Sequence, residues 1–159
     1  MIIYNPIGII HSSFLEPKGT PIQSAAALDS KATIELYAEY AEGLKDIEGF
    51  SHLILLYHFH RVKPSGLIVK PFLGNSSHGI FATRSPARPN QIGFSVVRLT
   101  GVDGNLLYIR DVDIVDKTPL LDIKPYIAEF DVRKAEKIGW FAENIHKMFA
   151  TKDDGRFAK

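Results

Sequence analysis

The stretch Phe94–Val112, FSVVRLTGVDGNLLYIRDV, decides the fold. Two β-branched, apolar-rich runs, Phe94–Val102 and Asn105–Val112, are separated only by the pair Asp103-Gly104, and such runs are typical of β-strands. An Asp-Gly pair favours a two-residue hairpin turn of the primed type, because the twist of that turn matches the twist of the flanking strands. The sequence therefore predicts an antiparallel hairpin here, and a fold that is rich in antiparallel pairs.

Working outward from the hairpin, other segments supply further elements. Ser51–Arg61 (SHLILLYHFHR) is too apolar at its centre for a surface strand, so we place it in the middle of the sheet with both faces covered. Strands are also expected over Ile2–Ser12 and Ala32–Leu36. The segment Leu15–Asp29 is rich in Pro, Gly, Ser and Ala and predicts a loop, whereas Glu39–Ile47 predicts one or two helical turns.

Apolar residues recur with helical spacing in the last part of the chain. With Asp131 in the capping position, this pattern predicts an amphipathic helix over about residues 131–150 that packs against the sheet. Short strands, two modest helices and no βαβ alternation predict a mainly β fold, a small antiparallel β-barrel with one or two edge helices. No repeat or linker divides the chain, so we expect a single domain over residues 1–159.

The composition excludes several classes of protein. Apolar residues make up 45% of the 159 residues, which is enough for a core, and the chain has no cysteine. Disulfides, thiolate metal sites and a cysteine nucleophile are therefore excluded. The longest apolar run, Leu53–Tyr57, falls far short of the roughly 18 residues of a membrane helix. Because Met1–Ile10 also lacks the basic flank of a signal peptide, we expect a cytoplasmic protein without a membrane span.

The charge is distributed unevenly along the chain. The formal net charge is +1, yet no Asp or Glu occurs between Gly49 and Val102, a segment that carries six Lys and Arg residues. A cationic middle within a slightly acidic remainder is typical of a domain that binds an anion, a nucleotide or a nucleic-acid backbone. The alternative is a chance clustering of solvated Lys and Arg side chains.

The first candidate site is Gly79–Gly93, GIFATRSPARPNQIG. Its two prolines stiffen the backbone, so that Arg84, Arg88 and Asn90 are positioned before any ligand arrives. Guanidinium groups bind a carboxylate or a phosphate with paired hydrogen bonds, and an Asn side chain offers both donors and acceptors. The alternative is a structural loop with surface arginines. No G-x-G-x-x-G sequence and no P-loop sequence accompanies this segment.

The second candidate site is Asp113–Tyr126, DIVDKTPLLDIKPY, which predicts a turn, a strand and a second turn. Asp122 and Lys124 lie two residues apart in the extended part and therefore share a face. They either pair with each other or hold the two charges of an amino acid. A surface ion pair alone stabilises a fold by only ~0 to 1 kcal/mol.

The third candidate site is the pair of histidines in Ser51–Arg61. His58 and His60 are expected on one face of the strand, which raises the question of a metal site. An H-x-H metal site also needs a carboxylate about four residues on, and Lys63 stands in that neighbourhood. We therefore expect no metal, and histidines that line a pocket mouth or hydrogen-bond within the core. A serine hydrolase is disfavoured too, since no G-x-S-x-G elbow occurs and Ser85 lies in the proline-rich loop.

Several motifs in this order resemble the TsaA-like family, also called YaeB-like or TrmO. The resemblance covers roughly Ile7–Tyr126. It rests on motifs spread along that range: GIIHS at Gly8–Ser12, PIQ at Pro21–Gln23, EGLKDIEGFSH at Glu42–His52, HFHR at His58–Arg61, FATRSP at Phe81–Pro86, RPN at Arg88–Asn90 and DKTPLLDIKPY at Asp116–Tyr126.

The resemblance implies a small β-barrel that binds S-adenosylmethionine, usually as a homodimer. It also implies methylation of N6 of the threonylcarbamoyladenosine at position 37 of a tRNA, next to the anticodon, and the cationic middle segment is compatible with that partner. By the same resemblance, the cofactor contacts fall on eleven residues: Pro21, Ile22, Gln23, His60, Arg61, Arg84, Phe94, Val115, Asp116, Lys117 and Thr118.

Two departures from the family pattern stand near these residues. The family usually reads R-P-N-P-I-G where this chain has Gln91, and D-G-T-P where it has Lys117. A lysine there brings a positive charge toward a sulfonium, which disfavours binding unless the ammonium turns outward or pairs with Asp116. A non-catalytic module that binds or senses S-adenosylmethionine is therefore the alternative to the enzyme.

The remaining roles follow from the proposed chemistry. Methyl transfer to a nitrogen acylated by a carbamoyl group is helped by a nearby proton acceptor, for which the candidates are Asp122, Tyr126 and His60, unranked. Phosphates and bases of the RNA are expected to meet Lys63, Lys70, Arg88 and Asn90. An aromatic side chain, Phe94 or Tyr126, would stack on the adenine, as unpaired bases are typically recognised.

Overall fold

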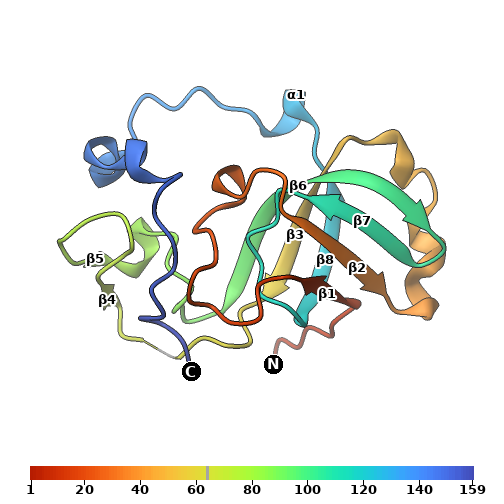
Figure 1. Ribbon diagram of the computed structural model, residues 1–159, viewed down its shortest axis with the longest axis horizontal. Helices are drawn as coiled ribbons and strands as arrows, with labels where there is room; N and C mark the ends of the chain where they lie inside the picture. Colours follow the sequence, from red (N-terminus) through yellow and green to blue (C-terminus); the bar gives the residue numbers. More distant parts are fainter. Residues whose placement is uncertain (64) are drawn as a thin grey trace.

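A closed antiparallel barrel of six strands forms the body of the protein. The structure is a computed structural model that describes residues 1–63 and 65–159. The strands follow the order β1-β2-β7-β6-β3-β8 around the barrel (Figure 1), and β4 and β5 form a separate two-stranded sheet. The bounds are β1 Gly8–Ser12, β2 Lys31–Leu36, β3 His52–His58, β4 Ile68–Val69, β5 His78–Gly79, β6 Ile92–Asp103, β7 Leu106–Arg110 and β8 Thr118–Pro125. The predicted mainly β, antiparallel barrel is confirmed.

Alternation along the strands closes the barrel around its core. In β3, Leu53, Leu55 and Tyr57 are buried, while the residues between them are partly exposed. The other five strands contribute inward side chains to the same cluster, among them Ile34 and Ile109. Because side chains alternate between the two faces of a strand, each strand buries one row against the barrel axis and leaves the other row outside.

The central position of β3 is confirmed, but the expectation that both its faces are covered is wrong. The strand pairs with β6 on one side and with β8 on the other. His52, Ile54 and Leu56 point outward and are only half-buried. A closed barrel explains the difference, because closure supplies two hydrogen-bonding neighbours without a second layer over the outer face.

The hairpin between β6 and β7 forms as predicted, with its turn one residue further along the chain. Asp103 pairs with Leu106, so the two-residue loop is Gly104-Asn105 rather than Asp103-Gly104. Gly104 has a φ of +60°, as the first central residue of a type II′ turn requires. The side-chain amide of Asn105 donates to the carbonyl of Leu36 at 2.6 Å and so fastens the turn to β2.

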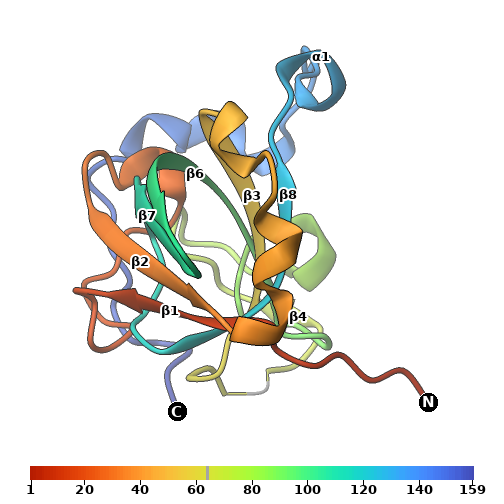
Figure 2. The same cartoon turned by 90° about the vertical axis from the view of Figure 1, so that its right-hand side faces the viewer.

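The amino-terminal strand is shorter than predicted. β1 begins at Gly8, and the apolar residues Met1–Tyr4 are exposed; Figure 2 shows this segment running away from the barrel. The helical turns expected over Glu39–Ile47 are present as 3₁₀ turns. The bounds of the helical elements are η1 Ser24–Ala26, η2 Ala38–Leu44, η3 Ile47–Gly49, η4 Ile80–Ala82, α1 Ala128–Asp131, η5 Gly139–Glu143 and η6 Ile145–Lys147.

The amphipathic helix predicted over about residues 131–150 is wrong. Asp131 ends α1 instead of starting a helix, and its Oδ2 accepts a hydrogen bond from the backbone N–H of Ile127 at 2.9 Å. Val132 is extended, and Gly139 has a φ of +58°. A positive φ interrupts a right-handed helix, so the apolar residues of this segment are carried by the short turns η5 and η6.

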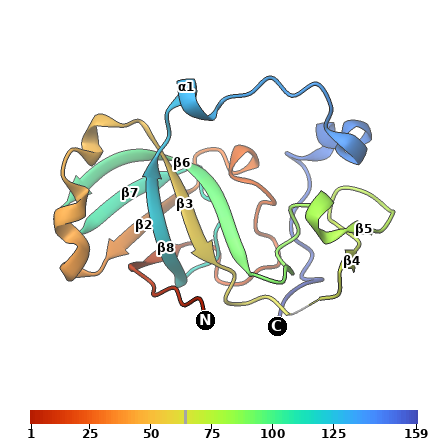
Figure 3. The ribbon, with the colours of Figure 1, turned by 180° about the vertical axis from the view of Figure 1, so that it is seen from behind.

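The last part of the chain packs against loops, not against the outside of the barrel sheet. After α1 the backbone crosses from the barrel to the side that carries β4 and β5, as Figures 1 and 3 show. Lys152 forms a β-bridge with Pro21, and Ala158 forms one with Val62. Phe157 is buried in a second apolar cluster with Val62, Val69, Ile80 and Ala87.

Candidate functional site

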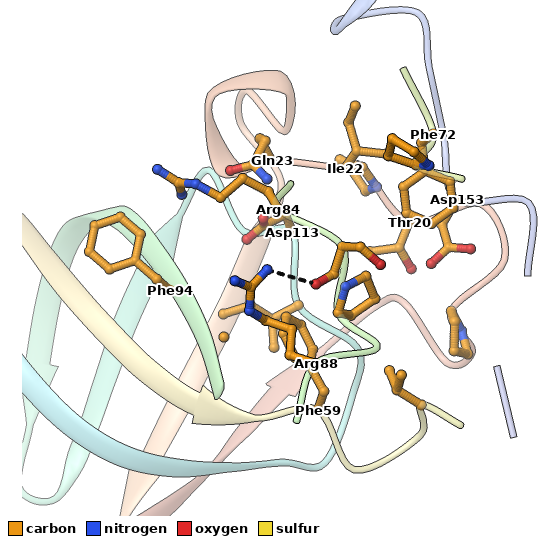
Figure 4. Close-up of a pocket in the computed structure, with 18 of the residues that line it drawn as sticks. Thr20, Ile22, Gln23, Phe59, Phe72, Arg84, Arg88, Phe94, Asp113 and Asp153 are labelled. Carbon is orange, nitrogen blue, oxygen red and sulfur yellow. Dashed lines mark hydrogen bonds between the residues drawn. The ribbon is translucent and has the colours of Figure 1, made fainter. Parts of the chain in front are cut away.

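A cavity of about 730 Å³ lies where the loops and the carboxy-terminal segment meet the barrel (Figure 4). Its walls come from residues 17–23, from the end of β3 and the following turn at 57–62, from 71–73, from 84–94, from 113–118 and from 138–153. These segments lie far apart in the sequence, and the folding of the barrel brings them together. The loop expected over Leu15–Asp29 thus forms one wall.

Most of the predicted cofactor contacts line this cavity. Nine of the eleven lie on its wall, and Asp116 and Lys117 do not. Among the predicted RNA contacts, Arg88 lines the cavity, whereas Lys63, Lys70 and Asn90 are exposed and do not line it. The nine cofactor candidates on the wall are Pro21, Ile22, Gln23, His60, Arg61, Arg84, Phe94, Val115 and Thr118.

Asp116 and Lys117 shape the turn beside the cavity. Asp116 Oδ1 accepts the backbone N–H of Ser12 at 2.9 Å, and the backbone N–H of Asp116 donates to the carbonyl of Phe14 at 2.7 Å. Lys117 is exposed with a φ of +62°. A positive φ favours glycine, which gives a physical reason for the glycine usual in the family pattern. The Lys117 side chain, with its ammonium group, does not line the cavity.

Arg84 presents its guanidinium at the barrel side of the cavity. Its Cζ lies 5.8 Å from the centroid of the Phe94 ring, and both side chains are exposed. No carboxylate among the described residues forms an ion pair with Arg84. The cation–aromatic contact is within the range of such interactions, and the guanidinium donors remain available for a ligand carboxylate or phosphate.

Arg88 holds the proline-rich loop together. Its Nη1 donates to the carbonyl oxygens of Thr83 at 2.9 Å and of Ile80 and Ser85 at 3.3 Å. The side chain is half-buried. Gln91, the first departure from the family pattern, also stabilises this region, because its Nε2 donates to the carbonyl of Val62 at 3.1 Å.

A buried hydrogen-bond network that the motifs did not indicate ends at the cavity. Ser95 Oγ donates to Asp113 Oδ1 at 2.6 Å, and the Tyr57 hydroxyl lies 2.8 Å from the same Oγ. Since the single Ser95 proton is used, Tyr57 is the donor. Burial raises the pKa of Asp113 to about 6 and holds the pKa of Tyr57 well above its usual value. Tyr57 and Asp113 both line the cavity.

One glycine makes room for this network. A Cβ on Gly93 would lie 2.1 Å from Cε2 of Tyr57, far inside the contact distance of two carbons. Ser95 follows two residues later on the inward face of β6, between apolar neighbours. The sequence signal was therefore a polar residue at an inward position of a strand, which burial makes costly unless it is hydrogen-bonded.

His60 lies in the turn after β3, not on the strand face that it was expected to share with His58. Its Nδ1 is 3.5 Å from Thr118 Oγ1, which itself donates to the carbonyl of Val115 at 2.6 Å. Burial lowers the pKa of His60, with a smaller contribution from Arg61. Within residues 1–63 and 65–159, no three His, Asp or Glu side chains converge as a metal site.

The other two candidates for a proton acceptor do not line the cavity. Asp122 Oδ2 and Lys124 Nζ form an ion pair at 2.8 Å, with 42% and 59% of their side chains exposed. This confirms that the two residues share a face and selects the pairing alternative. Tyr126 packs edge-on against His52, with 6.1 Å between the ring centroids, near the start of β3, and His60 follows the other end of that strand.

The carboxy-terminal segment supplies a wall that the sequence motifs did not include. Trp140 stacks on His78 at 4.3 Å and on Phe141 at 4.0 Å, and its Nε1 donates to the carbonyl of Ala82 at 2.8 Å. Burial raises the pKa of Asp153. The residues of this segment that line the cavity are Ile138, Trp140, Phe141, Ile145, Met148 and Asp153.

The protein is a small closed β-barrel whose loops and carboxy-terminal segment form the walls of a cavity. The chain belongs to the tRNA-methyltransferase O N-terminal domain family, which it matches over residues 9–132. The cavity wall formed by residues 138–153 lies beyond the matched range.

Relatives and a solved structure support this membership. A protein of Pyrococcus abyssi named "Probable S-adenosyl-L-methionine-binding protein" is 62% identical over 99% of this chain and 85% of its own length. The mouse "tRNA (adenine(37)-N6)-methyltransferase" is 36% identical over 82% of this chain and 32% of its own length. The crystal structure of TrmO from Pseudomonas aeruginosa superposes with a TM-score of 0.74 at 36% identity, over 88% of this chain and 62% of that one.

The chain thus spans most of the Pyrococcus relative, but about a third of the mouse enzyme. Among the described residues, no helix is both long enough and apolar enough to cross a membrane.

Proposed function

We propose that the chain is an S-adenosylmethionine-dependent tRNA methyltransferase that acts on N6 of threonylcarbamoyladenosine at position 37. The observation that carries the proposal is the cavity on whose wall nine of the eleven expected cofactor contacts meet. The names of the Pyrococcus and mouse relatives support the cofactor and the substrate class. The expected contacts with the RNA support it less, because three of the four lie outside the cavity.

The chemistry of the wall fits S-adenosylmethionine. The volume of about 730 Å³ is within the ~300–1,000 Å³ that ligand cavities usually have. Phe59, Phe72 and Phe94 offer aromatic surface for a base, and Arg84 offers donors for a carboxylate. Above its pKa of about 6, Asp113 is negatively charged, which suits a cationic ligand. When bound, the cofactor supplies a methyl group attached to a positively charged sulfur.

Within the cavity, His60 is the candidate that can accept a proton. Thr118 Oγ1 donates its proton to Val115, so it can only accept from His60, which assigns the imidazole proton to Nδ1. Nε2 then carries a free lone pair. Because burial lowers the pKa of His60, the ring is neutral near pH 7 and Nε2 can take the proton that leaves the substrate nitrogen.

A methyl-transfer assay tests the proposal. The chain is incubated with methyl-labelled S-adenosylmethionine and tRNA that carries threonylcarbamoyladenosine, and the digested nucleosides are separated. We expect label in the N6-methylated nucleoside and about a 100-fold lower turnover for His60→Gln. His58→Gln is the matched control, since His58 is the neighbouring histidine and does not line the cavity. Label in no nucleoside would refute the enzyme.

A module that binds S-adenosylmethionine without transferring the methyl group is the second candidate. The name of the Pyrococcus relative refers to binding alone, and the chain spans only 32% of the mouse enzyme. The same assay separates the two functions: tight binding of the labelled cofactor without transfer to the RNA supports the module.

The homodimer and the cytoplasmic location belong to the proposal as well. Phe130 in α1 and Val132 directly after it carry exposed apolar side chains, and an interface would cover them. Light scattering during size-exclusion chromatography would show the mass of a dimer, and the mass of a single chain would refute that part of the proposal.

A further inference from the structure

Ser85 lines the cavity, and its hydroxyl is buried without a partner in the described part of the chain. The residue is 3% exposed and lies between Arg84 and Pro86 in the proline-rich loop. Its Oγ has no hydrogen-bond partner among the described residues. In a folded protein most buried hydroxyls are hydrogen-bonded, and an exception calls for an explanation.

The side chain of Thr83 and the backbone of Ser85 are paired. Thr83 Oγ1 donates to the carbonyl of Ile80 at 2.8 Å and accepts the backbone N–H of Ser85 at 3.2 Å. The carbonyl of Ser85 accepts from Arg88 at 3.3 Å. Thr83 and the backbone of Ser85 therefore have partners, and the Ser85 hydroxyl has none among the described residues. Alanine would fill nearly the same volume and would avoid the cost of an unpaired buried hydroxyl.

We propose that the Ser85 hydroxyl is a specificity contact that hydrogen-bonds the adenosyl portion of the ligand. The inference rests on the proposed function, because it assumes that the cavity takes an adenosyl compound. Leu73, Pro86 and Phe72 line the same cavity with apolar surface, which suits a nucleoside better than a charged amino-acid end. The Oγ atom is closed to solvent in the ligand-free protein, so the contact requires the Ser85 side chain to turn about its Cα–Cβ bond toward the ligand. A hydroxyl both donates and accepts, so it can then pair with an edge of the base or with a ribose hydroxyl.

The amino-acid end of the ligand has partners elsewhere on the wall. Arg84 carries a guanidinium free of ion pairs within the described chain, and Gln23 offers a side-chain amide. Figure 4 shows both on the barrel side of the cavity, opposite Thr20, Phe72 and Asp153. Because Arg84 and Gln23 can take the charged end, we assign the Ser85 hydroxyl to the uncharged part of the ligand.

The test compares Ser85→Ala with Ser30→Ala in both thermal unfolding and ligand binding. Ser30 is the matched control, because its hydroxyl lies 2.7 Å from the carbonyl oxygens of Ala27 and Val112, either of which can accept its proton, and accepts the backbone N–H of Val112 at 2.8 Å. Ser30 does not line the cavity. S-adenosylhomocysteine and 5′-methylthioadenosine, which lacks the amino-acid end, are titrated by calorimetry.

We expect Ser85→Ala to unfold at the same temperature as the wild type or higher, and to bind both compounds roughly five-fold more weakly, as the loss of one neutral hydrogen bond implies. Ser30→Ala should unfold at a lower temperature and bind both compounds normally. If Ser85→Ala unfolds at a lower temperature, or binds both compounds as the wild type does, the inference is overturned.

Two further outcomes separate the possible errors. Weaker binding of S-adenosylhomocysteine with unchanged binding of 5′-methylthioadenosine would overturn the adenosyl assignment, because the hydroxyl would then contact the amino-acid end. If the wild type binds neither compound, the proposed function itself fails. If the wild type and Ser85→Ala bind both compounds equally well, only the inference about Ser85 fails.

Discussion

Replacing Asp113 by Asn should change how the stability of the protein depends on pH. Asp113 is partly buried at the end of the Tyr57–Ser95–Asp113 network, and the pKa of its carboxyl rises from 3.8 to about 6 because burial disfavours the charged form. Between these two values the folded state therefore binds more protons than the unfolded state. Consequently this carboxyl makes the free energy of unfolding decrease as the pH rises from below 3.8 to above 6.

The size of the effect follows from the shift in pKa. A rise from 3.8 to about 6 corresponds to about 3 kcal/mol between the two ends of this pH range. Asn cannot ionise, and its side-chain oxygen can still accept the hydrogen bond from Ser95. We therefore expect the stability of Asp113→Asn relative to the wild type to improve by about 3 kcal/mol from the acidic to the neutral end.

Urea unfolding followed by circular dichroism at several pH values across this range measures the difference. Asp103→Asn serves as the control, because Asp103 is an exposed carboxyl at the hairpin turn and its removal reports the effect of surface charge alone. A difference between Asp113→Asn and the wild type that stays constant with pH would show that the Asp113 carboxyl is not held in the buried, hydrogen-bonded setting described above.

Three further predictions concern the cavity. Arg84→Ala should weaken the binding of S-adenosylhomocysteine about ten-fold in calorimetry and leave thermal unfolding unchanged, since the side chain is exposed; wild-type affinity would contradict the role of this guanidinium. Gly93→Ala should cost about 1–3 kcal/mol of stability in urea unfolding, because its Cβ would collide with the Tyr57 ring, and an unchanged midpoint would contradict that contact. Trp140 is the single tryptophan and lines the cavity, so its fluorescence should change when ligand binds. Trp140→Phe removes the 2.8 Å hydrogen bond to the carbonyl of Ala82 and should weaken ligand binding several-fold. Fluorescence that does not change on addition of ligand would argue against a ligand near this wall.

The strands of the barrel could be predicted because their signals are local. The β6–β7 hairpin follows from two strand-forming runs on either side of a turn pair, and β3 follows from its apolar centre. Local signals did not exclude the helix that was wrongly predicted over residues 131–150. Its apolar residues have helical spacing, yet Ile138, Phe141 and Ile145 line the cavity from short turns, and the positive φ of Gly139 cannot be read from the spacing.

The candidate site shows the same division. Its proline-stiffened loop could be predicted because neighbouring residues determine its rigidity. By contrast, Ser95 is 18 residues from Asp113 and 38 residues from Tyr57 in the sequence. The only local mark of that network is Ser95, a polar residue at an inward position of β6. The role of Arg88 could not be predicted from the sequence either. An arginine that donates to three carbonyls of its own loop and an arginine that binds a phosphate look the same in a sequence.

A crystal structure of the chain with S-adenosylhomocysteine tests the central claim most directly. The account predicts density for the compound between residues 20–23 and 84–94, with its adenosyl portion within hydrogen-bond distance of Ser85 Oγ and its carboxylate at Arg84. Density for the compound at another place on the protein, with this cavity filled by solvent alone, would contradict the account.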